Sequence, residues 1–90
     1  MTSASKGAKQ PALLAEDGAT FHAYIEPVPG GEFQASYHAQ IDHLSHVEIE
    51  EPEYQLCVSK TEARAWVHGR AAARGFGKIL WDDEESMRPD

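Results

Sequence analysis

The chain has 90 residues, of which 41% are hydrophobic and 26% are charged, and its formal net charge at pH 7 is −7. This length allows one domain at most, and the composition is that of an ordinary globular protein. No apolar run approaches the roughly 20 residues that a helix needs to cross a bilayer. The negative charge disfavours nucleic acid as the default partner, because phosphate contacts dominate that affinity.

Cys57 is the only cysteine, which excludes an internal disulfide and favours a reducing, cytoplasmic setting. The N-terminal segment contains lysines but no apolar stretch, so we expect no secretory signal. Residues 1–19 are expected to be disordered or weakly ordered. A single domain is predicted over residues 20–81, and an acidic tail over residues 82–90.

Two alternating stretches predict a β-hairpin near the start of the domain. Residues 20–26 and 33–41 each alternate apolar with other side chains, which is typical of strands with one buried face. The segment between them, PVPGG at Pro27–Gly31, favours a turn, because prolines fix φ and glycines permit positive φ.

The register of this hairpin follows from its apolar faces. Matching them pairs Ile25 with Ala35, and the same register sets His22 opposite His38 on the exposed face. A slip of two residues would preserve the faces and separate the histidines, so both registers remain open.

The residues after the hairpin predict further short strands. Val47 and Ile49 alternate with glutamates and indicate a short, one-sided strand that ends before Pro52. A strand is expected over residues 54–58, with Gln55 and Cys57 outward and three side chains inward: Tyr54, Leu56 and Val58. Residues 78–81 favour a short C-terminal strand or an extended arm.

The clearest element is a helix from Ser59 to Phe76. Ser59 and Glu62 match a capping box, in which the serine accepts from the Glu62 amide and the carboxylate bonds the Ser59 amide. Gly75 is expected to end the helix in the left-handed conformation, with Phe76 making the hydrophobic contact of a Schellman motif.

Two stripes of this helix compete for the sheet. We expect the small-residue stripe to be buried: Ala65, Gly69, Ala72 and Phe76, with Trp66 and Ala73 beside it. The alternative stripe contains Ala63, Trp66 and Val67. It leads into Arg70 and Arg74, whose charges resist burial, so we expect an arginine face turned to solvent or to a partner.

The five histidines invite a metal hypothesis. His38, His43 and His46 are spaced H-x4-H-x2-H, whereas a zinc site needs three or four convergent ligands. The spacing matches no zinc module, so we expect surface histidines, no bound metal and no cofactor.

Catalytic chemistry is not expected either. Acid–base catalysis needs carboxylates whose surroundings push their pKa values apart, and the glutamates of residues 48–53 lie in a segment predicted to be solvated. Cys57 would need an adjacent basic group to become a nucleophilic thiolate. We therefore expect that the protein is not an enzyme.

The remaining candidate residues form interaction surfaces. On the helix they are Arg64, Arg70 and Arg74, and on the exposed sheet face they are His22, Tyr24 and His38. The expected partner is another protein or a second copy of the chain, because so small a core benefits from association. Nucleic-acid binding through the arginines is the alternative.

The element order resembles a known family. A hairpin, a third strand and a helix that opens with Thr61-Glu62-Ala63 resemble the small β-β-β-α domain of HicB-like antitoxin proteins, over Phe21–Ile41 and Ser59–Ala73. The family's Pro-Asp-x-Pro-Gly segment is replaced by Gln40-Ile41-Asp42-His43. The layout is also similar to the arm-binding domains of phage-type integrases. The first resemblance implies a toxin protein as partner, and the second implies DNA.

The sequence therefore predicts a small α+β domain. Its antiparallel sheet is expected to have three or four strands, one face covered by the helix, and a short C-terminal strand is possible. We expect a non-enzymatic protein-interaction module, antitoxin-like or self-associating.

Overall fold

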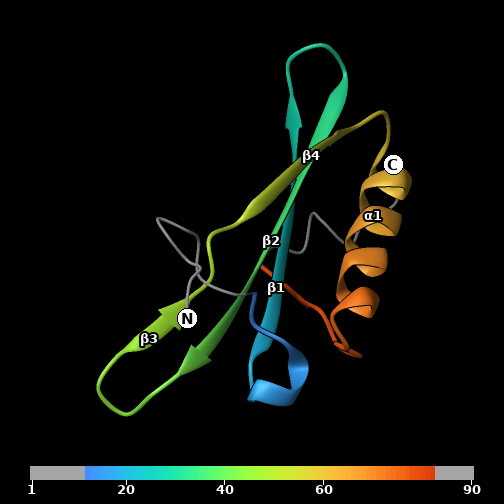
Figure 1. The fold of residues 1–90 in the computed structure, drawn as a ribbon. Helices are drawn as coiled ribbons and strands as arrows, with labels where there is room; N and C mark the ends of the chain where they lie inside the picture. Colours follow the sequence, from blue (N-terminus) through green and yellow to red (C-terminus); the bar gives the residue numbers. More distant parts are fainter. Residues whose placement is uncertain (1–11, 83–90) are drawn as a thin grey trace, which may run out of the picture.

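A long β-hairpin is the centre of the sheet in the computed structural model (Figure 1). It consists of β1 (Thr20–Val28) and β2 (Glu32–Asp42). The structure describes residues 12–82. The expectations of weak order up to residue 11 and of an acidic tail from residue 83 lie outside the described residues.

Of the two hairpin registers that the sequence leaves open, the structure has the one that sets His22 opposite His38. Ile25 pairs with Ala35 and His22 with His38, which excludes the two-residue slip. The closing turn has positive φ at both of its glycines, 96° at Gly30 and 82° at Gly31, as the PVPGG segment predicts.

Three shorter strands complete the sheet. β3 (Val47–Ile49) and β4 (Glu53–Cys57) pair antiparallel with β2, one after the other along the same side of that strand. β5 (Leu80–Trp81) pairs parallel with β1 on the opposite side. The predicted α+β class and the C-terminal strand are confirmed, and the described sheet has five strands.

One face of this sheet is covered by α1 (Lys60–Ala73), which contacts β1, β2 and β4 (Figure 1). A short 3₁₀ helix, Ala15–Asp17, precedes β1. The buried apolar side chains come from alternate strand residues, from one stripe of α1 and from Phe76 just after it: Phe21, Ala23, Ile25, Ala35, Tyr37, Ala39, Cys57, Ala63, Val67, Ala71 and Phe76. Several are alanines, which let the helix backbone approach the sheet closely.

The predicted buried stripe of α1 is wrong. Ala65, Gly69 and Ala72 are exposed, whereas Val67, on the rejected stripe, is fully buried. Only Phe76 of the predicted stripe is buried, as expected. The rejection assumed that Arg70 would resist burial on that side. Carboxylates from the sheet meet the arginines instead, so their charges do not oppose the packing.

The predicted orientation of β4 is also wrong. Cys57 is buried, while Tyr54, Leu56 and Val58 are 60%, 56% and 72% exposed. The register on β2 places Cys57 opposite Phe33, on the helix-covered face. The apolar character of the alternate residues therefore does not indicate burial in this strand.

The predicted helix ends are largely confirmed. The Glu62 amide donates to Ser59 Oγ over 3.1 Å, but the Glu62 carboxylate accepts from the Val58 amide rather than from the Ser59 amide. Gly75 has a φ of 85°, and the Phe76 amide donates to the Ala71 carbonyl over 2.9 Å, as in a Schellman motif.

Two glycines of this region should respond oppositely to alanine. Gly75→Ala forces an L residue into the left-handed region and should lower the free energy of unfolding by about 1 kcal/mol. Gly69→Ala, in the helix with open space at its Cβ, should raise it by up to about 1 kcal/mol. Urea denaturation of both variants measures the difference. Equal effects would contradict these cap and helix assignments.

Candidate interaction surface

The junction between β3 and β4 determines which side chains of these two strands lie on each face of the sheet. In β3, Glu48 pairs with Ile41, whereas in β4, Glu53 pairs with Tyr37, so one extra residue is accommodated between the strands. At the junction the Glu50 amide donates to the Ala39 carbonyl over 2.9 Å. The Ala39 amide in turn donates to a carboxylate oxygen of Glu50 over 3.3 Å. Glu50 thus completes the backbone bonding of β2 where the regular ladder is interrupted.

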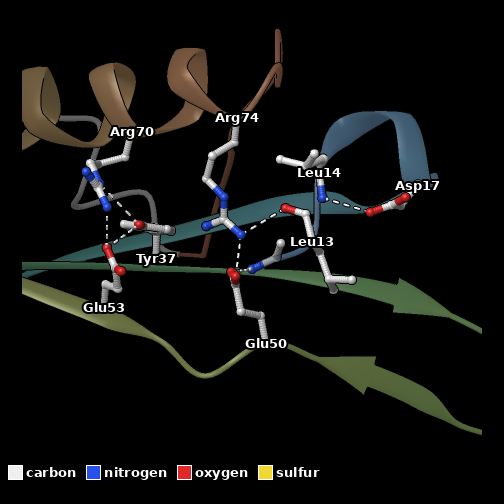
Figure 2. Close-up of polar contacts among 9 residues, drawn as sticks. Leu13, Leu14, Asp17, Tyr37, Glu50, Glu53, Arg70 and Arg74 are labelled. Atoms are coloured by element: carbon white, nitrogen blue, oxygen red, sulfur yellow. Dashed lines mark hydrogen bonds and ion pairs between the residues drawn. The ribbon is translucent and has the colours of Figure 1, made fainter. Parts of the chain in front are cut away.

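Arg74 holds this carboxylate from the helix side (Figure 2). Its Nη2 forms an ion pair with Glu50 Oε2 and donates to the Leu13 carbonyl over 2.8 Å. The Arg74 side chain is 11% exposed and that of Glu50 is 16% exposed. One guanidinium therefore connects the end of α1, the β3–β4 junction and the segment before β1.

A second polar cluster lies one helix turn earlier (Figure 2). Arg70 Nη2 pairs with Glu53 Oε1 at 2.9 Å, and Arg70 Nε donates to Tyr37 Oη over 3.2 Å. The Tyr37 hydroxyl donates to the same Glu53 oxygen. The guanidinium groups of Arg70 and Arg74 lie 6.0 and 5.5 Å from the Tyr37 ring centroid.

These contacts shift the titration of the groups involved. Burial, followed by the hydrogen bond to Glu53, raises the pKa of Tyr37. The hydrogen bond from Tyr37 lowers the pKa of Glu53, and the bond from Arg70 adds to that effect. Burial, with a smaller contribution from the charge of Glu62, raises the pKa of Cys57. The Cys57 thiol is thus held protonated rather than activated as a nucleophile.

The predicted arginine face is therefore not an open basic surface at Arg70 and Arg74. Both side chains turn toward the sheet and have carboxylate partners. Arg64, the third predicted residue, is half-buried. The role of this trio as a contact surface stays a prediction.

The other three predicted residues lie together, each half-buried, on the face of the sheet opposite α1. No described α-helix covers this face, and we call it the uncovered face. His22 and His38 stack with ring centroids 5.1 Å apart, and Tyr24 is next along β1 on the same face. His22 Nδ1 lies 3.5 Å from an Asp82 carboxylate oxygen. Within residues 12–82 no three histidine, cysteine or acidic side chains gather in an arrangement that could hold a metal ion.

Sequence reasoning missed the most exposed apolar residues. Apart from Leu14, the described large apolar residues that are exposed all lie in residues 44–58: Leu44, Val47, Ile49, Tyr54, Leu56 and Val58. Pairing with β2 places four of them on the uncovered face. We call these four, Val47, Ile49, Tyr54 and Leu56, the apolar edge. The alternation in residues 54–58 indicated that the apolar side chains share one face of the strand, but not which face of the sheet that is.

The strand carrying half of the apolar edge has an unpaired side. β4 pairs with β2, and no described strand lies along its other side. β5, at the opposite side of the sheet, is only two residues long, which limits its capacity to pair.

An apolar crevice of about 330 Å³ lies near β5 and is lined in part by Phe21, Phe76 and Lys78.

Comparison of the chain with protein-family models, with curated proteins and with solved structures gives no match. The resemblance to HicB-like antitoxins therefore stays a prediction. None of the helices in residues 12–82 has the length and apolar content needed to cross a membrane.

Loss of Arg74 should be costly. Arg74→Met leaves the Glu50 charge largely buried without its partner and should destabilise the fold by about 3 kcal/mol. Adding Glu50→Gln should recover part of that loss, since the amide oxygen can still accept from Ala39. Chemical denaturation checks both, with Lys78→Met as a surface control. A loss no larger than that of the control would refute the role of Arg74.

Glu53 should make stability depend on acid pH. Its pKa in the folded state is below the ordinary value of 4.5, so its contribution is present above that pH. The contribution is lost as the pH falls from 4.5 through the lower folded pKa. Wild type should therefore exceed Glu53→Gln in stability near neutral pH, and the difference should shrink in acid. Urea titrations across this range test it, with exposed Glu51→Gln as control; a pH-independent difference would contradict it.

Proposed function

We propose that the chain is a non-enzymatic protein-interaction module that binds its partner through β4 and the apolar edge. The observation that carries this proposal is the gathering of exposed large apolar side chains in residues 44–58. Scattered apolar residues are normal on a protein surface, whereas a contiguous group marks a contact site. Tyr54 and Leu56 of this group lie on β4, whose side away from β2 has no described strand and can add main-chain hydrogen bonds to the contact.

The charged groups support a binding role rather than a catalytic one. Tyr37, Glu53 and Arg70 bond to one another and join helix to sheet. Such mutual bonding stabilises a fold and commits the Tyr37 hydroxyl and one oxygen of Glu53 to structural contacts. A cytoplasmic setting for this module fits the single reduced thiol, Cys57.

Nucleic-acid binding has weaker support. The charges of Arg70 and Arg74 are compensated by Glu53 and Glu50, and the whole chain has a net charge of −7. Phosphate contacts require uncompensated cations along one surface. An antitoxin-like role remains compatible with the proposal, because it too requires a protein partner.

Leu56→Lys tests the proposed surface. A charge on β4, within the apolar edge, should weaken association at least tenfold, roughly the effect of losing one important contact. Leu44→Lys is the matched control, since Leu44 is exposed but lies outside β3 and β4. Sedimentation measures self-association, and affinity capture measures binding of other proteins. A strictly monomeric wild type that captures no protein would sink the proposal, as would equal behaviour of the two variants.

A further inference from the structure

We propose that the partner is a second copy of this chain, joined through antiparallel pairing of the two β4 strands about a two-fold axis at Gln55. This inference rests on the proposed function and specifies its partner and geometry. The geometry of this dimer is determined by the backbone groups that β4 directs away from β2, by the ends of that stretch, and by the side chains that would meet.

The direction of the backbone groups follows from contacts at the junction. The Ala39 carbonyl accepts from Glu50, so the odd-numbered residues of β2 direct their backbone groups toward β3 and β4. Successive residues of an antiparallel strand bond alternately to its two sides. Since Ala35 is paired with Gln55, the backbone groups of Gln55 face β2. Those of Tyr54 and Leu56 face outward.

Side-chain contacts agree with that assignment. The Leu56 carbonyl accepts a long 3.4 Å bond from the Gln55 side-chain amide, which caps an outward-facing acceptor. The Val58 amide, two residues further along the same side, donates to Glu62 over 2.8 Å. In a dimer, the Leu56 carbonyl would accept from a backbone amide of the second copy instead of from the Gln55 side chain. The bond from the Val58 amide to Glu62 would remain.

Both ends of the outward-facing stretch are closed to pairing. Pro52 has no N–H, and the Val58 N–H is already bonded to Glu62. Tyr54 and Leu56 remain, and neither proline nor charge protects them. Most natural edge strands carry such protection because an open, apolar edge recruits another strand.

These closed ends select one symmetric register. About an axis at Gln55, Tyr54 of each copy pairs with Leu56 of the other, and each pair can exchange both backbone bonds. A register centred on Tyr54 would bring in Pro52, and one centred on Leu56 would bring in Val58. In either case the pairs on both sides of the axis lack one backbone N–H donor, that of Pro52 or that of Val58.

Side-chain chemistry favours the same register. On the uncovered face it places an aromatic side chain, Tyr54, opposite an aliphatic one, Leu56, which is a stabilising cross-strand pair. On the helix side, Glu53 faces Cys57 of the second copy rather than its own equivalent, so the strongly acidic chain avoids a like-charge contact. The two Gln55 side-chain amides meet at the axis. The edge is thus complementary to itself, as an isologous contact requires.

The helices leave room for this pairing. α1 contacts β1, β2 and β4, so it lies over the region of β2. In the dimer the two β2 strands would be three strand spacings apart, about 14 Å. That separation exceeds the roughly 10 Å diameter of a helix, so two copies of α1 fit side by side on the same face.

A cysteine at the axis tests the register. In a Cys57→Ala background, Gln55→Cys places two thiols in a pair whose Cα atoms are about 4.5 Å apart, within disulfide range. Under mild oxidation this full-length variant should form covalent dimers at least about tenfold faster than Leu44→Cys in the same background, because the paired thiols have a high effective concentration. Equal rates would overturn the register.

Proline at Leu56 tests the backbone contact. Leu56→Pro removes an outward N–H without touching the bonds to β2, so it should raise the dimer dissociation constant at least about tenfold. Leu56→Ala controls for loss of the side chain and should have the smaller effect. Thermal unfolding of each variant at low concentration checks that the monomer remains folded. Equal effects of proline and alanine would overturn edge pairing.

The outcomes separate this inference from the proposed function. A monomeric wild type that binds a different protein in a Leu56-dependent manner would refute the second copy and leave the interaction module standing. A dimer insensitive to Leu56→Lys would refute both the pairing and the proposed surface. A dimer that dissociates with Leu56→Pro and cross-links at position 55 supports both.

Discussion

The ion pair between Arg74 and Glu50 is the contact on which the rest of the structure depends. Glu50 supplies the acceptor that the Ala39 amide lacks where the ladder between β2 and its neighbours is interrupted. Arg74 compensates the negative charge of Glu50, which is largely buried at this position. The same guanidinium donates to the Leu13 carbonyl. Four segments distant in sequence therefore meet at one pair of side chains.

That junction also determines which residues are exposed. The extra residue after Glu50 moves β4 by one position relative to β3, so that Glu53 reaches Tyr37 and Arg70 on the helix-covered face. Because side chains alternate along a strand, Tyr54 and Leu56 must then lie on the uncovered face. A polar network that stabilises the monomer thus creates its apolar surface.

Local patterns predicted the hairpin and both helix ends and limited the hairpin to two registers, because each depends on residues close in sequence or on one alternating face. The buried stripe of α1 and the orientation of β4 depend on partners far away in sequence. Val67 is buried because Glu53 and Glu50 compensate the arginines that follow it, and no helical pattern contains that information. One of the two open registers placed His22 opposite His38, as observed, whereas Tyr54 and Leu56 of the apolar edge were predicted to point inward.

Amide hydrogen exchange of β4, followed by NMR over a range of protein concentrations, tests the central claim most directly. The account predicts that the Gln55 amide is protected at every concentration, since it faces β2. The Tyr54 and Leu56 amides should become protected as concentration rises and lose that protection on dilution. Exchange of these two amides at the rate of an unprotected amide at every concentration would contradict pairing of the β4 edges.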